Sequence, residues 1–443
     1  MSVVMKFGGS SVESATAIAR VATIVQSRVH RHPVVVVSAM GKTTNRLLAM
    51  AAEAVSGSRT RALELCGELK HYHVIEGGAH PAIDEHFAEL SELLRGLAIL
   101  GELTPRSVDA ISSFGERLSS LLVTASFRRL GLDAVHADSR DYVITDGRHT
   151  QAAPLYEPTN QRLKNLTRGA VVVMGGFIGA TEDGVTTTLG RGGSDFSASI
   201  IGAGIDAEEI QIWTDVDGML TCDPRIVPGG HRVRLISFAE AAELAYFGAK
   251  VLHPSTVVPA VEKNIPVLIL NSRRPEVEGT RITGESVPCS NVVKSIACKT
   301  GIIVVNVQST RMLMAHGFLR RIFEVFDKHQ TSVDMVTTSE VSVSLTIDNP
   351  VNLAAIRADL EQFAEVEVAE GMAIISLVGD NIRSTPGVAH GVFKALNGTN
   401  VRMISQGASK RNISLVVEET SLRSAVESLH SEFFSQLDPA VFE

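Results

Sequence analysis

Short runs of β-branched residues alternate with helical patterns over about the first 290 residues. Val3–Phe7 predicts a strand that leads through a glycine-rich turn into a helix from about Ser14 to Arg28. Further strands are predicted at Val34–Ser38, Ala170–Met174, Glu209–Thr214 and Val267–Leu270. Continuous apolar strands separated by helices are typical of a largely parallel sheet covered on both faces. The pattern therefore predicts an α/β domain.

One helix start carries a specific signal. Ser237 stands three residues before Glu240, which is the spacing of a capping box ahead of the helical pattern Ala241–Lys250. This prediction brings Lys250 and Val251 to the C-terminal end of that helix.

The pattern of predicted helices and strands changes near residue 290, where an internal repeat begins. Gly317–Ile347 and Gly387–Val417 share an order of helix, polar turn and two strands, with Phe323 and Phe393 expected on the buried helix faces. Repeats of this size predict two small α+β modules that pack edge to edge. The predicted strands are Val333–Val336, Val341–Ile347, Val401–Ile404 and Ile413–Val417, and a second helix follows in each repeat at Leu353–Phe363 and Ser421–Phe434.

Composition narrows the class of protein. The 443 residues carry a net charge of −8, which disfavours a sequence-independent nucleic-acid binder. No stretch approaches the ~20 apolar residues of a membrane span, and the N-terminus lacks the build of a signal peptide. Cys66, Cys222, Cys289 and Cys298 show no metal-ligand spacing. We therefore expect a cytoplasmic enzyme that has no protein-bound metal site and no membrane or nucleic-acid partner.

A glycine-rich turn follows the first strand. Lys6 is followed by Phe7, then by Gly8, Gly9 and Ser10. Glycines let the backbone approach an anion, and the N–H groups that open a helix favour negative charge. The turn is not a Walker P-loop, because no Gly-Lys-Ser/Thr follows. A phosphate site and a tight turn with a surface lysine both fit this segment.

A second glycine-rich region lies further along. Gly175–Gly179 follows a strand, and Thr186–Asp195 reads TTTLGRGGSD before a helix. Ser194 and Asp195 fit as helix caps. Capping does not explain Arg191, whose guanidinium suits bidentate capture of a carboxylate. Together the two regions provide the groups needed to hold two anionic reactants.

A third region contains Trp213–Gly218 and Asp223–Arg225. A strand that ends in Thr-Asp and is followed by a glycine turn and Asp-Pro-Arg could frame a nucleotide. A purely structural alternative, an Asp-Gly hairpin turn with an Asx-type bend, explains the same residues.

The ordered set KFGGSSV, GRGGSD, WTDVDG, DPR and FGAKVLHP resembles the aspartate kinases of the amino-acid-kinase superfamily. The C-terminal repeat resembles the tandem ACT domains of that family. The segments SVDMVTTSEVSVSLT and HGFL are most similar to the lysine-inhibited, monofunctional class. The resemblance implies an amino-acid-kinase fold, a mainly parallel sheet between helices, followed by two ferredoxin-like ACT modules. The expected catalytic domain is 1–290 and the regulatory region 291–443, with modules at about 305–370 and 371–443 and possible strand exchange.

The resemblance also assigns roles. Lys6 would contact the ATP phosphates and the transferred group, beside Gly8, Gly9 and Ser10. Arg191 would clamp the α-carboxylate of aspartate. Lys6, Arg191, Asp195 and Lys250 are the implied catalytic residues. The other implied substrate contacts are Thr44, Glu116 and Ser194, and the other implied nucleotide contacts are Thr214, Asp215, Leu220, Arg225 and Val251. Leu220 departs from the family, which often has a tyrosine there.

In the resembled class, free lysine binds where the first ACT modules of two chains meet, which also implies a homo-oligomer, a dimer or a dimer of dimers. Asp334 and Glu340 would receive the amines of lysine. A structural alternative is that Gly317 opens a helix while Asp334 and Glu340 cap strand ends. Ala315 replaces a serine often seen in the family. The other matching residues are Met312, Met314, Phe318, Leu319, Ser332, Val333 and Thr338.

The chemistry fits this assignment. A carboxylate nucleophile is already ionised near pH 7, so making an acyl phosphate needs no general base. Catalysis reduces to aligning two anions and neutralising the γ-phosphoryl group with Lys6, Lys250, loop N–H groups and Mg²⁺ held mainly by ATP. His253 is interpreted as structural. Two alternatives stay open: another kinase of this fold, such as an acetylglutamate or nucleoside-monophosphate kinase, and a catalytically silent ACT sensor of amino acids.

Overall fold

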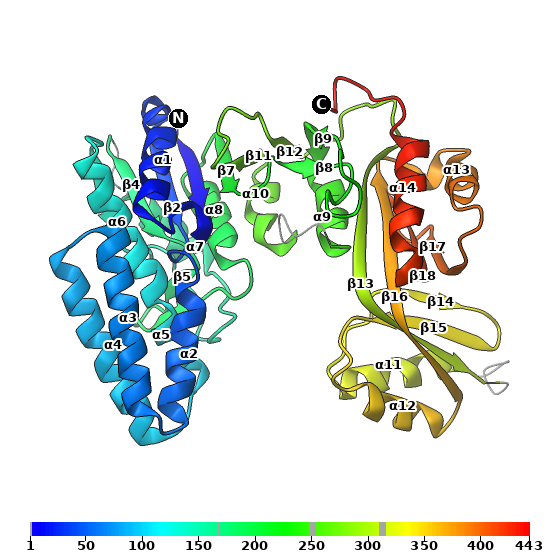
Figure 1. Ribbon diagram of the computed structural model, residues 1–443, viewed down its shortest axis with the longest axis horizontal. Coiled ribbons are helices and arrows are strands. Elements are labelled where there is room, and N and C mark those ends of the chain that lie inside the picture. The colour runs from blue at the N-terminus through cyan, green and yellow to red at the C-terminus, as the bar shows by residue number, and fades with distance from the viewer. Residues whose placement is uncertain (1, 167–168, 249–253, 310–315) are drawn as a thin grey trace. The chain divides into compact units, whose positions relative to one another are not determined.

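The computed structural model describes residues 2–166, 169–248, 254–309 and 316–443. The chain divides into two compact units, Met1–Met219 with Val251–Glu285 and Leu220–Lys250 with Ser286–Glu443. Each unit has its own main sheet (Figure 1). Within the described residues, no helix combines the length and apolar character needed to cross a membrane.

The first unit is built on a sheet with the strand order β12-β11-β7-β1-β2-β4-β3. All neighbouring pairs are parallel except β11 and β12. Every residue of β1, β2 and β4 is buried, as expected for strands covered on both faces. The predicted strands are confirmed, and β3 and β12 were not predicted. The bounds are β1 Val3–Phe7, β2 Pro33–Val37, β3 Ala134–Ala137, β4 Val171–Gly175, β7 Glu209–Thr214, β11 Val267–Asn271 and β12 Thr280–Thr283.

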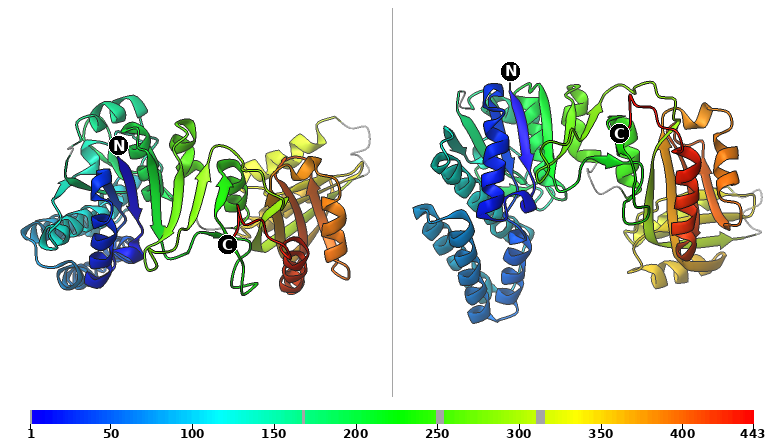
Figure 2. Two further views of the ribbon diagram at one scale, coloured as in Figure 1. Left: turned by 90° about the horizontal axis from the view of Figure 1, so that it is seen from above. Right: turned by 45° about the horizontal axis from the view of Figure 1, so that its top comes forward.

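Helices surround this sheet, and three of them, α2, α3 and α4, extend together beyond it (Figures 1 and 2). The side chain of Ser14 caps the predicted first helix by accepting from the N–H of Ala17. The bounds are α1 Ala15–Gln26, α2 Thr43–Val55, α3 Arg59–Gly77, α4 Pro81–Leu100, α5 Pro105–Ser112, α6 Phe114–Arg129, α7 Tyr156–Leu163, α8 Gly193–Gly204 and α10 Val258–Glu262. A small hairpin joins β5 Ile178–Ala180 and β6 Thr186–Thr188.

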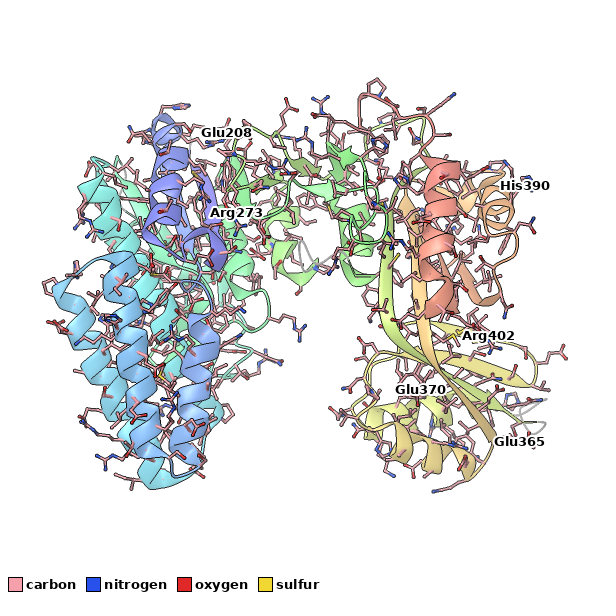
Figure 3. The ribbon with its side chains drawn as sticks, viewed as in Figure 1. Glu208, Arg273, Glu365, Glu370, His390 and Arg402 are labelled. Atoms are coloured by element: carbon pink, nitrogen blue, oxygen red, sulfur yellow. The ribbon has the colours of Figure 1, made fainter. Side chains whose placement is uncertain are left out.

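The second unit holds a six-stranded antiparallel sheet with the order β14-β15-β13-β16-β18-β17. The long strands β13 and β16 run through both repeats. Ile303–Gln308 of β13 pairs with β15, whereas Val293–Lys299 pairs with the half of β16 that adjoins β18. In Figure 3, Glu365 and Glu370 come from β16 and Arg402 from β17. The strand bounds are β13 Val293–Gln308, β14 Val336–Thr338, β15 Ser342–Ile347, β16 Glu365–Gly379, β17 Val401–Gln406 and β18 Asn412–Glu418.

Four helices pack on the six-stranded sheet, α11 with α12 and α13 with α14 (Figure 1). They are α11 Phe318–Lys328, α12 Leu353–Glu361, α13 Val388–Ala395 and α14 Leu422–Phe433. Short elements complete the chain: β8 Met219–Leu220, β9 Arg232–Val233, β10 Leu235–Ser237 and α9 Phe238–Tyr246.

The prediction of which helix residues of the repeat are buried was wrong by one position. Phe323 and Phe393 are each 42% exposed rather than buried. In α11 the buried ridge is Phe318, Ile322 and Phe326, spaced four residues apart. A helix turns by about 100° per residue, so Phe323 follows Ile322 out of the core.

Two predicted boundaries also shift. The strand predicted at Val333–Val336 is β14, Val336–Thr338, because the N–H of Met335 donates to the side chain of Thr346 at 2.9 Å instead of joining a regular ladder. The capping box of Ser237 and Glu240 is confirmed, but its helix α9 ends at Tyr246 and not at Lys250. Gly248, with φ at +118°, marks the break in helical backbone.

Candidate functional site

The glycine-rich segments meet at the carboxyl ends of the parallel strands, the usual ligand position in such sheets. In Figure 3, Glu208 marks the amino end of β7, and Arg273 lies just past the carboxyl end of the neighbouring β11. A pocket of about 300 Å³ opens at this edge. It is lined by Lys6, Ser38, Thr44, Glu116, Phe177, Gly190, Gly192, Gly193, Ser194 and Asp195.

Lys6 and Asp195 form the charged centre of this pocket. Lys6 is the fourth residue of β1, and Asp195 lies in the first turn of α8. The Lys6 Nζ lies 2.6 Å from Asp195 Oδ1, with 11% and 18% of the two side chains exposed. The ammonium is therefore held in place and is still open to the pocket.

The turn after β1 requires one of its two glycines. A Cβ on Gly9 would lie 2.7 Å from the carbonyl oxygen of Ala39 and 2.9 Å from that of Gly41, both backbone atoms. A Cβ on Gly8 would meet the Trp213 carbonyl oxygen at 3.8 Å, an ordinary contact. Ser10 follows in the single 3-10 turn Gly9–Ser11. Gly9 thus lets the turns after β1 and β2 touch, whereas the position of Gly8 has room for a Cβ without a close contact.

Glu116 is the most perturbed acid of the pocket. Its side chain comes from the first turn of α6 and is almost fully buried. Oε1 accepts a hydrogen bond from the N–H of Ala39 at 3.1 Å, while Oε2 is buried with no hydrogen-bond partner among the described residues. Burial raises the pKa of this carboxyl to about 8, against the opposing effects of the Ala39 N–H and the Lys6 ammonium. The group is set up to receive a cation.

Arg191 lies next to the pocket but does not line it. Its side chain is exposed, and among the described residues it makes no ion pair. Gly190 and Gly192 on either side have φ of +76° and +70°. This backbone presents the guanidinium to solvent beside Ser194. Ser194 itself packs against Gly176: a Cβ on Gly176 would lie 2.7 Å from the Ser194 Cβ.

The remaining substrate and nucleotide candidates are distributed between the two units. Thr44 begins α2 and lines the pocket. Thr214 ends β7, where its hydroxyl donates to Asp215 at 3.2 Å. Leu220 and Arg225 belong to the second unit, where Arg225 is bound by Asp223 at 2.6 Å. Lys250, Val251 and His253 lie outside the described residues.

The effector candidates lie around the start of α11 and β14. Asp334 does not cap an exposed strand end: Lys299 of β13 holds it at 2.8 Å, and only 8% of the Asp334 side chain is exposed. Lys299 also binds Asp348 at 2.9 Å, and the Tyr246 hydroxyl donates to Asp334 at 3.4 Å. Gly317 does open helix α11, with Phe318 buried, while Leu319, Ser332, Thr338 and Glu340 are exposed and Val333 is half-buried. Met312, Met314 and Ala315 lie outside the described residues.

Sequence reasoning missed several of these neighbours. Ser38 lines the pocket directly after β2, and its position at a strand end was a usable signal. Phe177 also lines the pocket, with φ at +63°. The pairing of Lys299 with Asp334 joins residues 35 positions apart. No local pattern could reveal that contact.

Comparisons with known families match two separate stretches of the chain. The amino acid kinase family matches residues 1–271, and an ACT domain family matches residues 375–433. A curated relative, aspartokinase 2, chloroplastic, of Arabidopsis thaliana, is 41% identical over 98% of this chain and 85% of its own length. Lysine-sensitive aspartokinase 3 of Escherichia coli (strain K12) is 36% identical, over 98% of this chain and 99% of its own.

A solved structure is similar in fold as well. Aspartokinase III of E. coli in complex with aspartate and ADP, in its R-state, superposes with a TM-score of 0.82. The two are 34% identical, and the match covers 98% of this chain and 100% of the other.

Proposed function

The chain belongs to the amino acid kinase family and, within it, to the aspartokinases, and from this premise we propose how its pocket performs the reaction. The γ-phosphoryl group of ATP is transferred to the β-carboxylate of L-aspartate, giving 4-phospho-L-aspartate and ADP. This product opens the route to lysine, threonine and methionine. The observation that carries the proposal is the pocket itself, in which Lys6, Asp195 and Glu116 converge at the ends of parallel strands.

In this proposal, Lys6 stabilises the transferred group. Its ammonium lies at the strand end, 3.9 Å from where a Cβ on Gly8 would be, so a phosphate bound by Lys6 would lie next to the Gly8 backbone. The carboxylate of aspartate attacks the γ-phosphorus in line, and negative charge moves toward ADP. A fixed ammonium lowers the energy of that charge distribution more than that of the ground state. Asp195 keeps the ammonium in position.

Glu116 and Arg191 would recognise the free amino acid. The unpartnered Oε2 of Glu116 suits the α-ammonium, and a guanidinium suits the α-carboxylate as a bidentate donor. Thr44 and Ser194 add hydroxyl groups on the pocket wall. Arg191 would turn from solvent onto the substrate, which its flanking glycines permit.

The nucleotide contacts extend this site. We assign Ser10, Gly8 and Gly9 to the phosphates, and Thr214, Asp215, Leu220, Arg225, Lys250 and Val251 to the rest of ATP. Asp195 and Ser194 offer oxygen donors of the kind Mg²⁺ prefers. When bound, Mg²⁺ neutralises charge on the phosphates, which would supply most of its ligands.

A direct assay tests the function. The purified chain is incubated with ATP, Mg²⁺ and aspartate, and hydroxylamine traps any acyl phosphate as a hydroxamate. Product formed with aspartate but not with acetylglutamate or a nucleoside monophosphate supports the proposal. Product formed with one of those two acceptors instead identifies another kinase of this fold. Binding of amino acids without product identifies a silent sensor.

Regulation by lysine is the second part of the proposal. The region 291–443 is assigned to regulation and 1–290 to catalysis, and the relative named lysine-sensitive aspartokinase 3 supports lysine as effector. The amines of lysine would bind Asp334 and Glu340, near Gly317 and Leu319. Because Lys299 already holds Asp334, the effector ammonium would compete with a lysine of the chain itself.

We also propose that the chain forms homo-oligomers through its ACT modules. Strands β14 and β17 are the two end strands of the six-stranded sheet, and end strands offer backbone groups that can pair with another copy. Light scattering would measure the mass. All four cysteines are free, which supports a reducing compartment such as the cytoplasm.

A further inference from the structure

A second cavity lies at the carboxyl ends of β3 and β4, next to the substrate pocket along the same edge of the sheet. It measures about 190 Å³, several times the space that one water needs. Cationic and imidazole groups dominate its wall, and Ala82 of α4 closes one side. The polar lining side chains are His86, Arg117, Ser120, His136, Asp138, Ser139 and Arg140. We call this cavity the β3–β4 pocket.

Two arginines give the β3–β4 pocket fixed positive charge. The Arg117 side chain is 10% exposed, binds Glu89 at 2.8 Å, and has an Nε that is buried with no hydrogen-bond partner among the described residues. Arg140 is 27% exposed; its Nε and Nη2 donate to Asp138, which also lines the pocket, and its Nη1 donates to Thr186 at 3.4 Å. Each guanidinium is therefore fixed by a carboxylate, and the buried Nε of Arg117 and the remaining N–H groups are left for a ligand.

Backbone and imidazole groups also border the pocket. Helix α4 begins at Pro81, so its N-terminal end, with its partial positive charge, borders the pocket at Ala82, whose N–H is already capped by the His80 side chain at 3.2 Å. His136 is fixed by a contact of 3.0 Å between its Nε2 and the Ser120 hydroxyl. The backbone oxygen of Ala82 holds Nδ1 of His86 at 2.7 Å.

The two imidazoles are held toward the neutral form mainly by burial, which lowers the pKa of each. For His86, Arg117 and Arg140 lower the pKa further, while the backbone oxygen of Ala82 and the Glu89 carboxylate raise it. For His136, the Asp138 carboxylate raises the pKa against burial. An anion that enters the pocket would raise the pKa of both histidines. The charged and titratable groups that act on the pair are Arg117, Glu89 and Arg140 on His86, and Asp138, His86, Arg128 and His80 on His136.

We propose that the β3–β4 pocket binds a small oxyanion, a phosphate or carboxylate group, between Arg117, Arg140 and the N-terminus of α4. The site is separate from the substrate pocket but adjoins it. Arg117 follows Glu116 on α6, and a Cβ on Gly175, which lines the β3–β4 pocket, would lie 3.0 Å from the Cβ of Glu116. A bound anion would therefore sit directly behind the acid of the substrate pocket.

Calorimetry with inorganic phosphate and, in a separate arm, succinate tests the site on the full-length chain at constant ionic strength. The discriminating variant is Ala82→Glu, which places a carboxylate in the β3–β4 pocket at a helix N-terminus, where negative charge is tolerated. Ala88→Glu adds the same charge to an exposed position of the same helix and serves as the matched control. Unchanged melting temperatures exclude misfolding.

The expected result is saturable binding of one anion per chain, weakened about tenfold or more by Ala82→Glu and little by Ala88→Glu. NMR signals of His86 and His136 should shift with the same midpoint. Binding of phosphate alone or succinate alone assigns the class of anion. Lack of saturation up to about 10 mM, equal weakening by both variants, or loss of binding in Lys6→Ala would overturn the proposal, since the last result would place the anion in the substrate pocket.

Discussion

At the scale of single residues, the substrate pocket places Lys6, Asp195 and Glu116 around one opening, and one oxygen of Glu116 has no hydrogen-bond partner among the described residues. Lys6 is held by Asp195 at 2.6 Å, and its Nζ lies 3.9 Å from where a Cβ on Gly8 would be. Lys6→Ala should lower kcat about a hundredfold or more, because a preorganised charge acts mainly in the transition state. Lys263→Ala, on an exposed lysine, is the control. A Lys6→Ala variant that keeps more than about a tenth of wild-type kcat would contradict this role.

Arg191 allows a different test, because it should act on one substrate only. Loss of a bidentate contact costs about 2–3 kcal/mol, so Arg191→Ala should raise the KM for aspartate tens- to over a hundredfold. The KM for ATP should change little. Arg148→Ala removes another exposed arginine as a control. Equal rises in both KM values would show general damage, and an unchanged aspartate KM would remove Arg191 from the site.

Glu116 links substrate binding to protons. With a pKa of about 8, its carboxyl is mostly protonated at pH 7 in the free enzyme. An arriving ammonium stabilises the carboxylate and lowers this pKa, so aspartate binding should release close to one proton at pH 7 and far less at pH 9, where the group is already ionised. Calorimetry in two buffers of different ionisation enthalpy measures the release. Glu116→Gln should abolish it; an equal release from that variant would assign the proton elsewhere.

At the scale of single residues, the sequence predicted the site best at positions where the reaction requires a particular type of side chain. Five of the predicted residues, Lys6, Thr44, Glu116, Ser194 and Asp195, line one pocket. Arg191 does not line it: Gly190 and Gly192, both with positive φ, set the backbone on either side of it, and its exposed side chain has no ion-pair partner among the described residues. The partner of Asp334 was missed since Lys299 reaches it through sheet pairing, which no local spacing encodes.

At the scale of elements, the contact between the turns after β1 and β2 shapes the pocket. Gly9→Ala would push a Cβ to 2.7 Å from the Ala39 carbonyl oxygen, so we expect a loss of about 1–3 kcal/mol in the free energy of unfolding. Gly8→Ala, with a nearest contact at 3.8 Å, should lose less than about 1 kcal/mol. Urea denaturation of both variants measures the difference. Equal stabilities would mean that the two turns separate easily.

Elements with strong periodicity were predicted well. Buried parallel strands appear as continuous apolar runs, and the capping box of Ser237 and Glu240 fixed the start of α9. The end of α9 was misplaced: the helix ends at Tyr246, and Gly248, with φ at +118°, follows it. The start of β14 was misplaced where the N–H of Met335 bonds the side chain of Thr346, eleven residues further along. The exposed Phe323 shows the same limit of prediction from local sequence. Phe323 and Ile322 are both apolar, and only the packing of the folded chain determines that Ile322 is the buried one.

At the scale of the whole molecule, regulation requires the second unit to influence a pocket in the first. Tyr246, the last residue of α9, contacts Asp334, and α9 precedes the segment that carries Lys250. An effector that binds Asp334 acts on the residues around that contact. It can inhibit only if it prefers a low-activity state, since a ligand shifts an equilibrium by its differential affinity.

Two variants of the Asp334–Lys299 pair should therefore change lysine inhibition in opposite directions. Asp334→Ala removes the carboxylate that would bind the effector, so inhibition should weaken about tenfold or more with little change in uninhibited kcat. Lys299→Met removes the internal ammonium that competes for Asp334, so lower concentrations of lysine should inhibit. Initial rates measured against lysine, threonine and methionine decide the matter, with Lys263→Met as the control. If lysine up to millimolar levels leaves the wild-type rate unchanged, the effector is wrong; if both variants shift inhibition the same way, lysine does not compete with Lys299 for Asp334.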